Sequence, residues 1–317
     1  MADDTPAQPG TRRMSQVFEA GRAGETPDVP MRYEALEAAA LDALSPEAYD
    51  YVAGGAGGED TVDRNREAFR EHRLLPRVLR DVGERDLSTT VCGTSLSFPV
   101  MLAPVGVQSI IHEEGEAATA RAAEELGMGM VSSSAASTTM EDIAAELDDA
   151  PGWFQLYWSA DDDLAKSFVD RAAAAGYEAL VVTLDTPMLA WRERDMQRAY
   201  LPFLDRDGVA NYFSDPTFQS RVDGDVDADP EAAVDAVGDE ADVLFDSGIR
   251  RGADVLKALA LGADAVLLGR PYVYGLALDG AAGVRAVCEN LLADLDLAMG
   301  LVGRDDVADV DESVLAE

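Results

Sequence analysis

The sequence predicts an α/β fold: a (β/α)8 barrel of the TIM type that lacks its fifth and sixth βα units and follows a helical leader. After residue 98, six short apolar runs alternate with amphipathic segments, as parallel strands do when crossover helices join them. Between Asp185 and Val243 this alternation stops for 57 residues, and no strand is predicted there. A barrel of this type needs eight strands to close, and two βα units of about 30 residues each would fill the interval.

The chain before the barrel is predicted to be largely helical. Residues 1–30 are rich in proline, glycine, threonine and charge, so we expect a leader that is flexible or lies along the surface. Residues 31–95 form a helical preface, in which Ser45 and Pro46 supply the N-cap and first turn of one helix. The length of 317 residues would also fit two domains of about 150 residues each, and length alone does not decide.

The barrel itself is predicted over residues 96–305, and residues 306–317 form an acidic tail. Each predicted strand ends in polar or glycine-containing residues, which is where such barrels carry their active sites. The strands are expected at 99–104, 129–134, 153–158, 179–185, 242–246 and 264–269. The helices are expected at 115–126, 139–147, 164–175, 252–261 and about 283–299, with one short helix at 230–239 inside the long interval.

The charge balance is strongly acidic. Asp and Glu number 61 against 25 Lys and Arg, which gives a net charge of −36. Nucleic acids and anionic membranes are excluded as partners, because their binding depends on Lys and Arg. Only Lys166 and Lys257 are lysines. This composition predicts adaptation to high salt, where ions screen a dense carboxylate surface; an ordinary acidic protein is the alternative.

The cysteines and the N-terminal residues give no sign of disulfides, a metal site or a signal peptide. Cys92 and Cys288 are too few for a disulfide framework and too isolated for a metal site. The first residues contain no apolar stretch typical of a signal peptide, and no run approaches 18 apolar residues. We therefore expect a cytoplasmic protein that binds no metal and does not insert into a membrane. The sequence leaves open whether it forms a homo-oligomer.

Two loops near the end of the predicted barrel suit a phosphate group. The loops at 246–252 and 269–271 each offer glycine amides and an arginine, and barrels often bind phosphate after their last two strands. The alternative is that Gly248 and Gly269 form tight turns and that Arg250 and Arg270 pair with nearby acids.

Seven stretches in order along residues 31–305, outside the long interval, resemble one family. They are YDYVAGGAGGEDTVDRNREAF, PVMLAPVGVQ, EGEAATARAAEELG, WFQLYW, VVTLDTP, DSGIRRGADVLKALALGADAVLLGRP and YGLALDGAAGVRAV. They resemble the FMN-dependent 2-hydroxy acid oxidases and dehydrogenases, which include glycolate oxidase, lactate oxidase and lactate 2-monooxygenase. The stretches APVGVQSIIHEEGE, DTPMLAWRERD and YLPFL to NYFSDP look most like the lactate 2-monooxygenase branch.

The resemblance implies FMN as cofactor and a small L-2-hydroxy acid such as L-lactate as substrate. It leaves open whether dioxygen is the further reactant, as in the oxidases and monooxygenases of the family, or another electron acceptor serves, as in its dehydrogenases. Tyr51 and Tyr157 match the substrate tyrosines, Arg192 matches the arginine near the substrate carboxylate, and Asp185 matches the carboxylate that orients the catalytic histidine. The matches to the FMN contacts are Pro104, Val105, Gly106, Ser133, Gln155, Thr183, Asp246, Ser247, Gly248, Ile249, Arg250, Gly269 and Arg270.

Each of these residues also has a plainer interpretation. Tyr51 and Tyr157 could be core or surface aromatics, Asp185 could cap a helix or turn, and Arg192 could be one charge on a solvated loop. The position of Tyr157 and Asp185 at strand ends favours a functional role.

The family's catalytic histidine, its flavin lysine and a second carboxylate arginine lie in a KG motif and an SNHGGRQ-type motif, and neither motif occurs here. Of the remaining histidines, His112 is expected to be structural and His72 to lie on the surface. Three hypotheses follow: a family enzyme with impaired catalysis, a non-catalytic flavin-binding or interaction protein that completes its sheet with another chain, and an unstable gene product. A different barrel enzyme would need its own base and nucleophile, and the sequence shows no such cluster.

Overall fold

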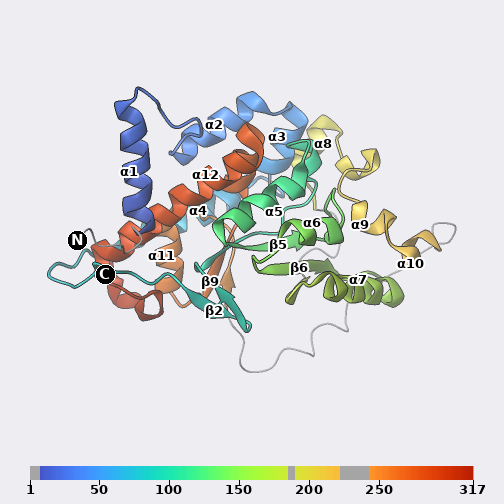
Figure 1. Ribbon diagram of the computed structural model, residues 1–317. Helices are drawn as coiled ribbons and strands as arrows, with labels where there is room; N and C mark the ends of the chain where they lie inside the picture. The colour runs from blue at the N-terminus through green and yellow to red at the C-terminus, as the bar shows by residue number, and fades with distance from the viewer. Residues whose placement is uncertain (1–7, 185–189, 222–242, 317) are drawn as a thin grey trace.

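The centre of the protein is one parallel sheet of six strands, seen in a computed structural model that describes residues 8–184, 190–221 and 243–316 (Figure 1). All six strands predicted from the sequence are confirmed. Their order is β7-β6-β5-β4-β9-β8, and each neighbouring pair is parallel. The strands are β4 (Val100–Leu102), β5 (Gly129–Ser133), β6 (Gly152–Tyr157), β7 (Ala179–Thr183), β8 (Leu244–Phe245) and β9 (Ala265–Leu268).

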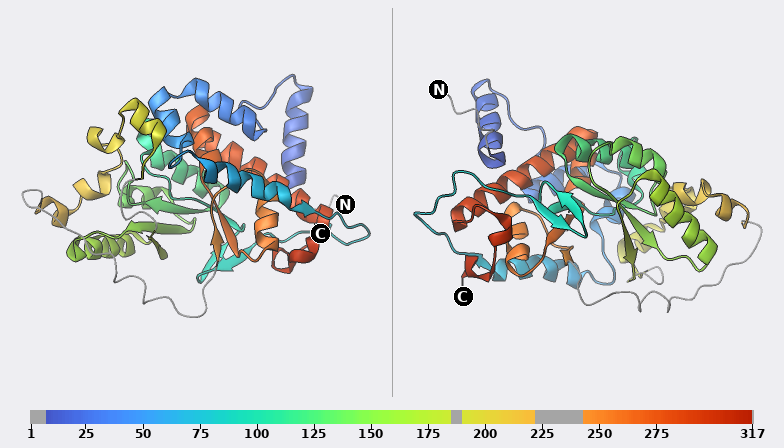
Figure 2. Two further views of the ribbon diagram at one scale, coloured as in Figure 1. Left: turned by 180° about the vertical axis from the view of Figure 1, so that it is seen from behind. Right: turned by 60° about the horizontal axis from the view of Figure 1, so that its bottom comes forward.

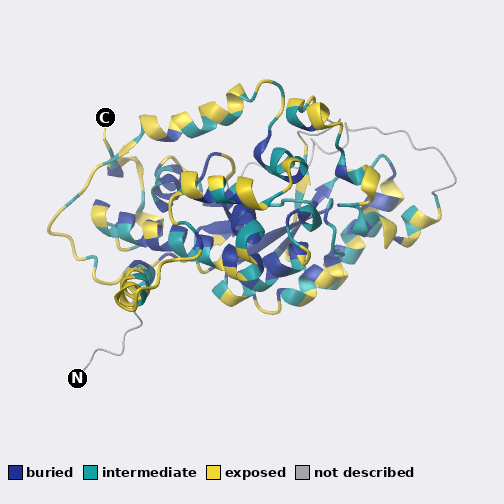
Figure 3. Ribbon diagram, turned by 90° about the horizontal axis from the view of Figure 1, so that it is seen from above, coloured by how far each residue is buried: buried dark blue, intermediate teal, exposed yellow. Residues whose placement is uncertain are grey.

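Helices follow these strands at the predicted places, and the buried residues gather in the interior of the molecule (Figure 3). The barrel helices are α5 (Gly115–Leu126), α6 (Met140–Glu146), α7 (Asp162–Ala175), α11 (Gly252–Ala260) and α12 (Arg270–Val302). The last helix, α12, packs against the helices α1 (Pro9–Arg22), α2 (Tyr33–Ala43), α5 and α11. Its backbone departs from helical φ/ψ angles at Asp279 and Gly280. It is longer than expected, because the sequence placed its start near residue 283. No helix among the described residues is both long and apolar enough to cross a membrane.

Residues 9–22 of the leader form a helix that lies against α12, which matches the surface-bound one of the two arrangements expected from the sequence. Helix α1 (Pro9–Arg22) lies on α12 (Figure 1). The Gly10 amide donates to Asp296 Oδ2 at 2.9 Å, and the Arg13 guanidinium pairs with Glu289 at 2.8 Å. A buried carboxylate and an ion pair thus hold this part of the leader against α12.

Helices occupy the first part of the predicted helical preface, up to residue 71, whereas residues 72–95 contain no helix. The helices are α2 (Tyr33–Ala43), α3 (Pro46–Ala53) and α4 (Asp60–Glu71). The Ser45 side chain accepts a hydrogen bond from the Ala48 amide at 3.1 Å, and Pro46 opens the helix as predicted.

The structure contains two short antiparallel strand pairs that the sequence did not predict. A hairpin of β2 (Thr89–Val91) and β3 (Thr94–Leu96) places Val91 and Leu96 in one apolar cluster with Met101, Val131 and Trp153 of the sheet. The Trp153 indole donates to Thr94 Oγ1 at 3.1 Å. The tail is docked as well, because β10 (Leu315–Ala316) pairs with β1 (Arg73–Leu74) after two 3-10 turns, η4 (Val307–Asp309) and η5 (Glu312–Val314).

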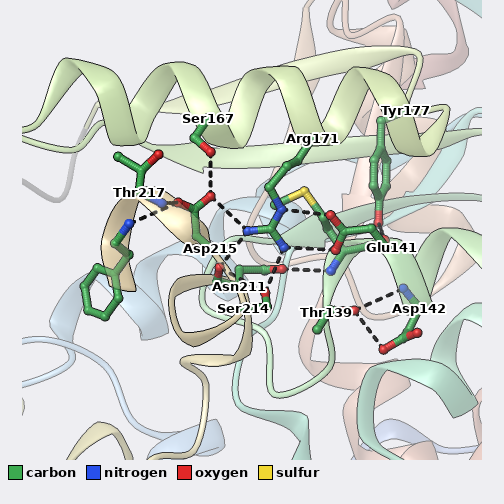
Figure 4. Close-up of polar contacts among 12 residues, drawn as sticks. Thr139, Glu141, Asp142, Ser167, Arg171, Tyr177, Asn211, Ser214, Asp215 and Thr217 are labelled. Carbon is green, nitrogen blue, oxygen red and sulfur yellow. Dashed lines mark hydrogen bonds and ion pairs between the residues drawn. The ribbon is translucent and has the colours of Figure 1, made fainter. Parts of the chain in front are cut away.

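The described part of the long interval contains no strand, as predicted, but it holds three short helices where the sequence predicted a long loop. Arg171 on α7 fixes this segment to the outside of α6 and α7 (Figure 4). Its guanidinium donates to the Asn211 carbonyl at 2.8 Å and to Ser214 Oγ at 2.8 Å, and it pairs with Glu141 and with the fully buried Asp215. The helices are α8 (Glu193–Arg198), α9 (Ala210–Phe213) and α10 (Pro216–Gln219), with a 3-10 turn at η2 (Pro202–Asp205). The predicted helix at 230–239 lies outside the described residues.

The sheet is an open half-barrel whose two edges are β7 and β8 (Figure 2). Within the described residues each edge strand pairs with one neighbour only. Apolar side chains on these strands are exposed: Leu180 is 42% exposed, Val182 39% and Phe245 39%. Phe154 on β6 and Val266 on β9 are fully buried, so the exposure is confined to the edges. Native sheets normally cover or pair such edges.

Candidate active site

A cavity of about 320 Å³ opens at the carboxyl ends of β4, β8 and β9. This is the end of the sheet that carries active sites in α/β barrels. The loops after these three strands and the helices α3 and α4 form its walls. The lining residues are Tyr51, Val52, Gly54, Val62, Asn65, Pro104, Val105, Gly106, Arg192, Asp246, Ser247, Gly248, Ile249, Arg250, Leu267, Gly269, Arg270 and Val273.

The loop after β4 requires a glycine where it passes the loop after β5. A Cβ atom on Gly106 would lie 2.5 Å from the carbonyl oxygen of Ala135, which is too close for any side chain. The loops are also joined by a hydrogen bond of 3.0 Å from the Val107 amide to the same carbonyl. Pro104, Val105 and Gly106 therefore present their backbone to the cavity at a fixed distance from the neighbouring loop.

The loop after β8 is held from below by a buried carboxylate. Asp254, 3% exposed in the first turn of α11, accepts the Arg250 and Arg251 amides at 3.0 and 3.1 Å. Arg66 on α4 reaches the same carboxylate at 2.9 Å and donates to the Gly248 carbonyl at 2.9 Å. Gly248 has a φ of 79°, and a Cβ there would lie 2.6 Å from the Asn65 carbonyl, so the turn needs glycine. The two helices thus shape the predicted phosphate loop.

Arg250 and Arg270 are free of acidic partners within the described residues. The Arg250 guanidinium lies over the Tyr33 ring at 4.6 Å and donates from Nη1 to the Ile249 carbonyl. The Arg250 Nε atom is buried and has no hydrogen-bond partner among the described residues. Arg270 donates to the Val52 carbonyl at 3.1 Å. Two guanidinium groups with spare donors at glycine-rich turns fit a phosphate dianion.

Two predicted substrate residues meet at the cavity. The Arg192 guanidinium lies 5.1 Å from the centre of the Tyr51 ring and donates to the Tyr51 carbonyl at 2.6 Å. Arg192 also pairs with Asp195 at 2.5 Å, so it is not an unpaired charge on a solvated loop. Burial raises the pKa of Tyr51 to about 12, although Arg192 opposes the shift, and the nearby Tyr157 raises it further. The Tyr51 hydroxyl therefore stays protonated and can donate at neutral pH.

Other predicted residues lie beside the cavity. Ser133 Oγ donates to Gln155 Oε1 at 3.1 Å, and Gln155 Nε2 donates to Thr183 Oγ1 at 2.7 Å. This chain of polar groups crosses the ends of β5, β6 and β7, and Tyr157 pairs in register with Thr183. None of these four residues lines the cavity, and Asp185 lies outside the described residues.

The chain's only two histidines and two lysines are all described, and none lines the cavity. His112 Nδ1 accepts from the Glu114 amide at 3.2 Å, and His72 follows the end of α4. Lys166 pairs with Asp170 on the exposed face of α7, and Lys257 donates to the Phe69 carbonyl at 2.6 Å. Within the described residues, the cavity wall therefore contains no histidine and no lysine.

Comparison with known proteins identifies the family. The family model described as FMN-dependent dehydrogenase matches residues 40–232 and 226–317. This chain belongs to that family. L-lactate oxidase of Lysinibacillus sphaericus is 33% identical, with 86% of this chain and 89% of that protein covered, and 2-hydroxyacid oxidase 1 of Homo sapiens is 34% identical, with 87% and 94% covered. A crystal structure of mandelate oxidase with benzoyl-formic acid matches at a TM-score of 0.78 and 33% identity, over 90% of this chain and 98% of that chain.

Membership of the FMN-dependent dehydrogenase family makes FMN the family cofactor and 2-hydroxy acids the family substrates. The half-barrel described above matches the mandelate oxidase barrel. The spare Arg250 donor and the glycine turns have the chemistry that a phosphate group such as that of FMN requires.

The sequence did not reveal Arg66, Asn65 and Asp254 as parts of the site. Asp254 had a usable signal, because an acidic residue at the third position of a helix commonly caps it. Arg66 had none, since it meets Gly248 across 182 positions of sequence.

Proposed function

We propose that this chain holds FMN in the cavity and binds a small L-2-hydroxy acid, L-lactate, but turns it over slowly. The observation that carries the proposal is Arg250, whose buried Nε has no partner within the described residues at a glycine turn shaped for phosphate. Arg270 and the backbone of Gly248 and Gly269 complete this phosphate site. Bound FMN would supply the acceptor for the two electrons that leave the substrate.

The chain's own residues would bind the substrate and contact the flavin ring. Tyr51, protonated at neutral pH, donates to the substrate, and Arg192 attracts its carboxylate. Tyr157 is the second substrate tyrosine, and Asp185 keeps the role that the family resemblance gives it. Ser133, Gln155 and Thr183 form a linked row of polar groups that would meet the flavin ring.

Slow turnover follows from the missing base. A general base contributes about 10²- to 10⁴-fold to rate, and neither histidine of this chain lines the cavity. The alignment with the Lysinibacillus oxidase is 346 residues long but covers 86% of this chain, about 273 residues, so the relative has about 73 residues without a counterpart here. That length and the exposed edges of β7 and β8 support the loss of the fifth and sixth βα units.

A non-catalytic flavin-binding protein is the second candidate. The feature that favours it is the pair of open sheet edges, which another chain could complete. Under either proposal the working unit is the barrel at residues 96–305 with its helical preface at 31–95, in the cytoplasm. We also propose that the chain belongs to the lactate 2-monooxygenase branch of the family and uses dioxygen as a reactant. This part of the proposal rests on three sequence stretches alone.

The proposed function is tested by binding rather than by rate. Apoprotein titrated with FMN should quench flavin fluorescence at a stoichiometry of one, and L-lactate should then perturb the visible flavin spectrum. D-lactate, which places its hydroxyl differently, is the control and should perturb the spectrum at least about 10-fold more weakly. A chain that does not bind FMN, or that responds equally to both isomers, contradicts the proposal.

We also propose adaptation to high salt, from the net charge of −36. Raising KCl from 0.1 M to 3 M shortens the screening length from about 10 Å to below about 3 Å, which weakens carboxylate repulsion in the folded state. The melting temperature followed by circular dichroism should rise by at least about 5 °C. Sucrose at matched osmolality carries no ions and should give a smaller rise; equal rises would contradict charge screening.

A further inference from the structure

Glu116 is a fully buried carboxylate behind the cavity. It lies in the first turn of α5, and its Oε1 accepts the Gln108 and Ser137 amides, each at 3.0 Å. Its Oε2 accepts from Thr138 Oγ1 at 3.2 Å. Within the described residues no basic side chain pairs with it. Because its donors come from the loops after β4 and β5, one carboxylate ties together two loops at the active end of the sheet.

Gln108 extends this contact to the cavity wall. It is fully buried, and its Nε2 donates to the Val105 carbonyl at 2.8 Å, while its Oε1 accepts from Thr119 Oγ1 at 2.6 Å. Nε2 also lies 3.3 Å from the Tyr272 hydroxyl, which donates to the Ala103 carbonyl at 3.0 Å. Two carbonyls of the loop after β4 are therefore held from the side away from the cavity.

The loop adopts a shape that it would not keep unaided. Val107 has a φ of 57°, a left-handed conformation unfavourable for a β-branched residue. Surrounding contacts must offset that strain. The hydrogen bonds of Glu116 and Gln108 stabilise this backbone on the side away from the cavity. On the other side, Pro104, Val105 and Gly106 line the cavity.

We propose that Glu116 and Gln108 are positioning residues, which set the backbone of residues 103–107 in the geometry that receives FMN. The proposal rests on the proposed function, because it concerns FMN binding in the same cavity. A carboxylate suits this task, since charge-assisted hydrogen bonds to amides are stronger than neutral ones. Burial raises the pKa of Glu116, so the position works against the charged form, and its three donors offset part of that penalty.

The test compares two near-isosteric variants with a matched control. Glu116→Gln places an amide group where two amides donate, and Gln108→Met removes the donor to Val105. FMN dissociation constants from fluorescence quenching should rise about 10-fold or more in both. The visible circular dichroism of the flavin, measured at saturating FMN, should change as well. Asp296→Asn is the control, because Asp296 is equally buried but holds α1 and Arg85; it should lower the melting temperature and leave FMN affinity within about 2-fold.

Three outcomes are distinguishable. Lower melting temperatures in Glu116→Gln and Gln108→Met, with FMN affinity and flavin dichroism unchanged, would assign these residues a structural role only and overturn the inference. If either variant fails to fold, Thr119→Val removes only the hydroxyl that donates to Gln108, and unchanged FMN binding there overturns it equally. A wild-type chain that does not bind FMN contradicts the proposed function itself, and the inference with it.

Discussion

Supplying the two βα units proposed to be missing is expected to raise the turnover of L-lactate by about 10²- to 10⁴-fold. The change replaces residues 222–242 with the segment of the Lysinibacillus L-lactate oxidase that corresponds to the fifth and sixth βα units. This segment would carry a base, a flavin lysine and a second arginine, and it would pair with the exposed edges of β7 and β8. Turnover is measured as anaerobic reduction of the bound flavin.

The control for this insertion is the same chimaera with alanine at the histidine of the SNHGGRQ-type motif. It should fold and bind FMN like the active chimaera but lose most of the gain, because only the base differs. A chimaera that binds FMN and melts cooperatively, yet turns over no faster than the present chain, would show that the missing segment is not the cause of slow catalysis.

Removal of the Arg250 side chain is expected to weaken FMN binding by about 10- to 100-fold. A hydrogen bond to a charged group contributes about 1.5–3 kcal/mol, and Arg250→Ala takes away the guanidinium with the spare buried donor. Fluorescence titration with FMN gives the dissociation constants. Riboflavin, which lacks the phosphate, should bind the wild type and the variant with similar affinity, so the loss is assigned to the phosphate.

Arg251 provides the matched control for Arg250. It is the next residue, but its side chain is 54% exposed, pairs with Glu34 and does not line the cavity. Arg251→Ala should leave FMN affinity within about 3-fold, since an exposed pair contributes little. Equal losses in the two variants would place the phosphate elsewhere or reveal a general effect of charge.

The fold was predictable where local pattern decides structure. The short apolar runs at 99–104 and 264–269 favoured buried strands, and their alternation with amphipathic segments indicated parallel units. Helix α1 and the β2–β3 hairpin were missed because partners distant in sequence hold them: Asp296 accepts from Gly10, and the hairpin joins the cluster around Trp153. No local pattern reports such contacts.

The candidate site was predicted in part, and for a comparable reason. Residues in continuous motifs, such as Gly248, Arg250 and Arg270, line one cavity as expected. Arg66 and Glu116, which shape the loops from behind, carry no motif of their own. Ser133 and Gln155 were predicted as FMN contacts, and the structure places their polar atoms against each other beside the cavity.

We propose that this chain retains the FMN cavity and lacks the base that drives catalysis. Protein loaded with FMN in high salt and mixed anaerobically with L-lactate tests it most directly, with the visible absorption band of the oxidised flavin as readout. We expect the band to shift as substrate binds and to stay unbleached over many minutes. Complete bleaching within seconds would contradict the claim, because it would mean that this chain, without a histidine or lysine in its cavity, still oxidises the substrate efficiently.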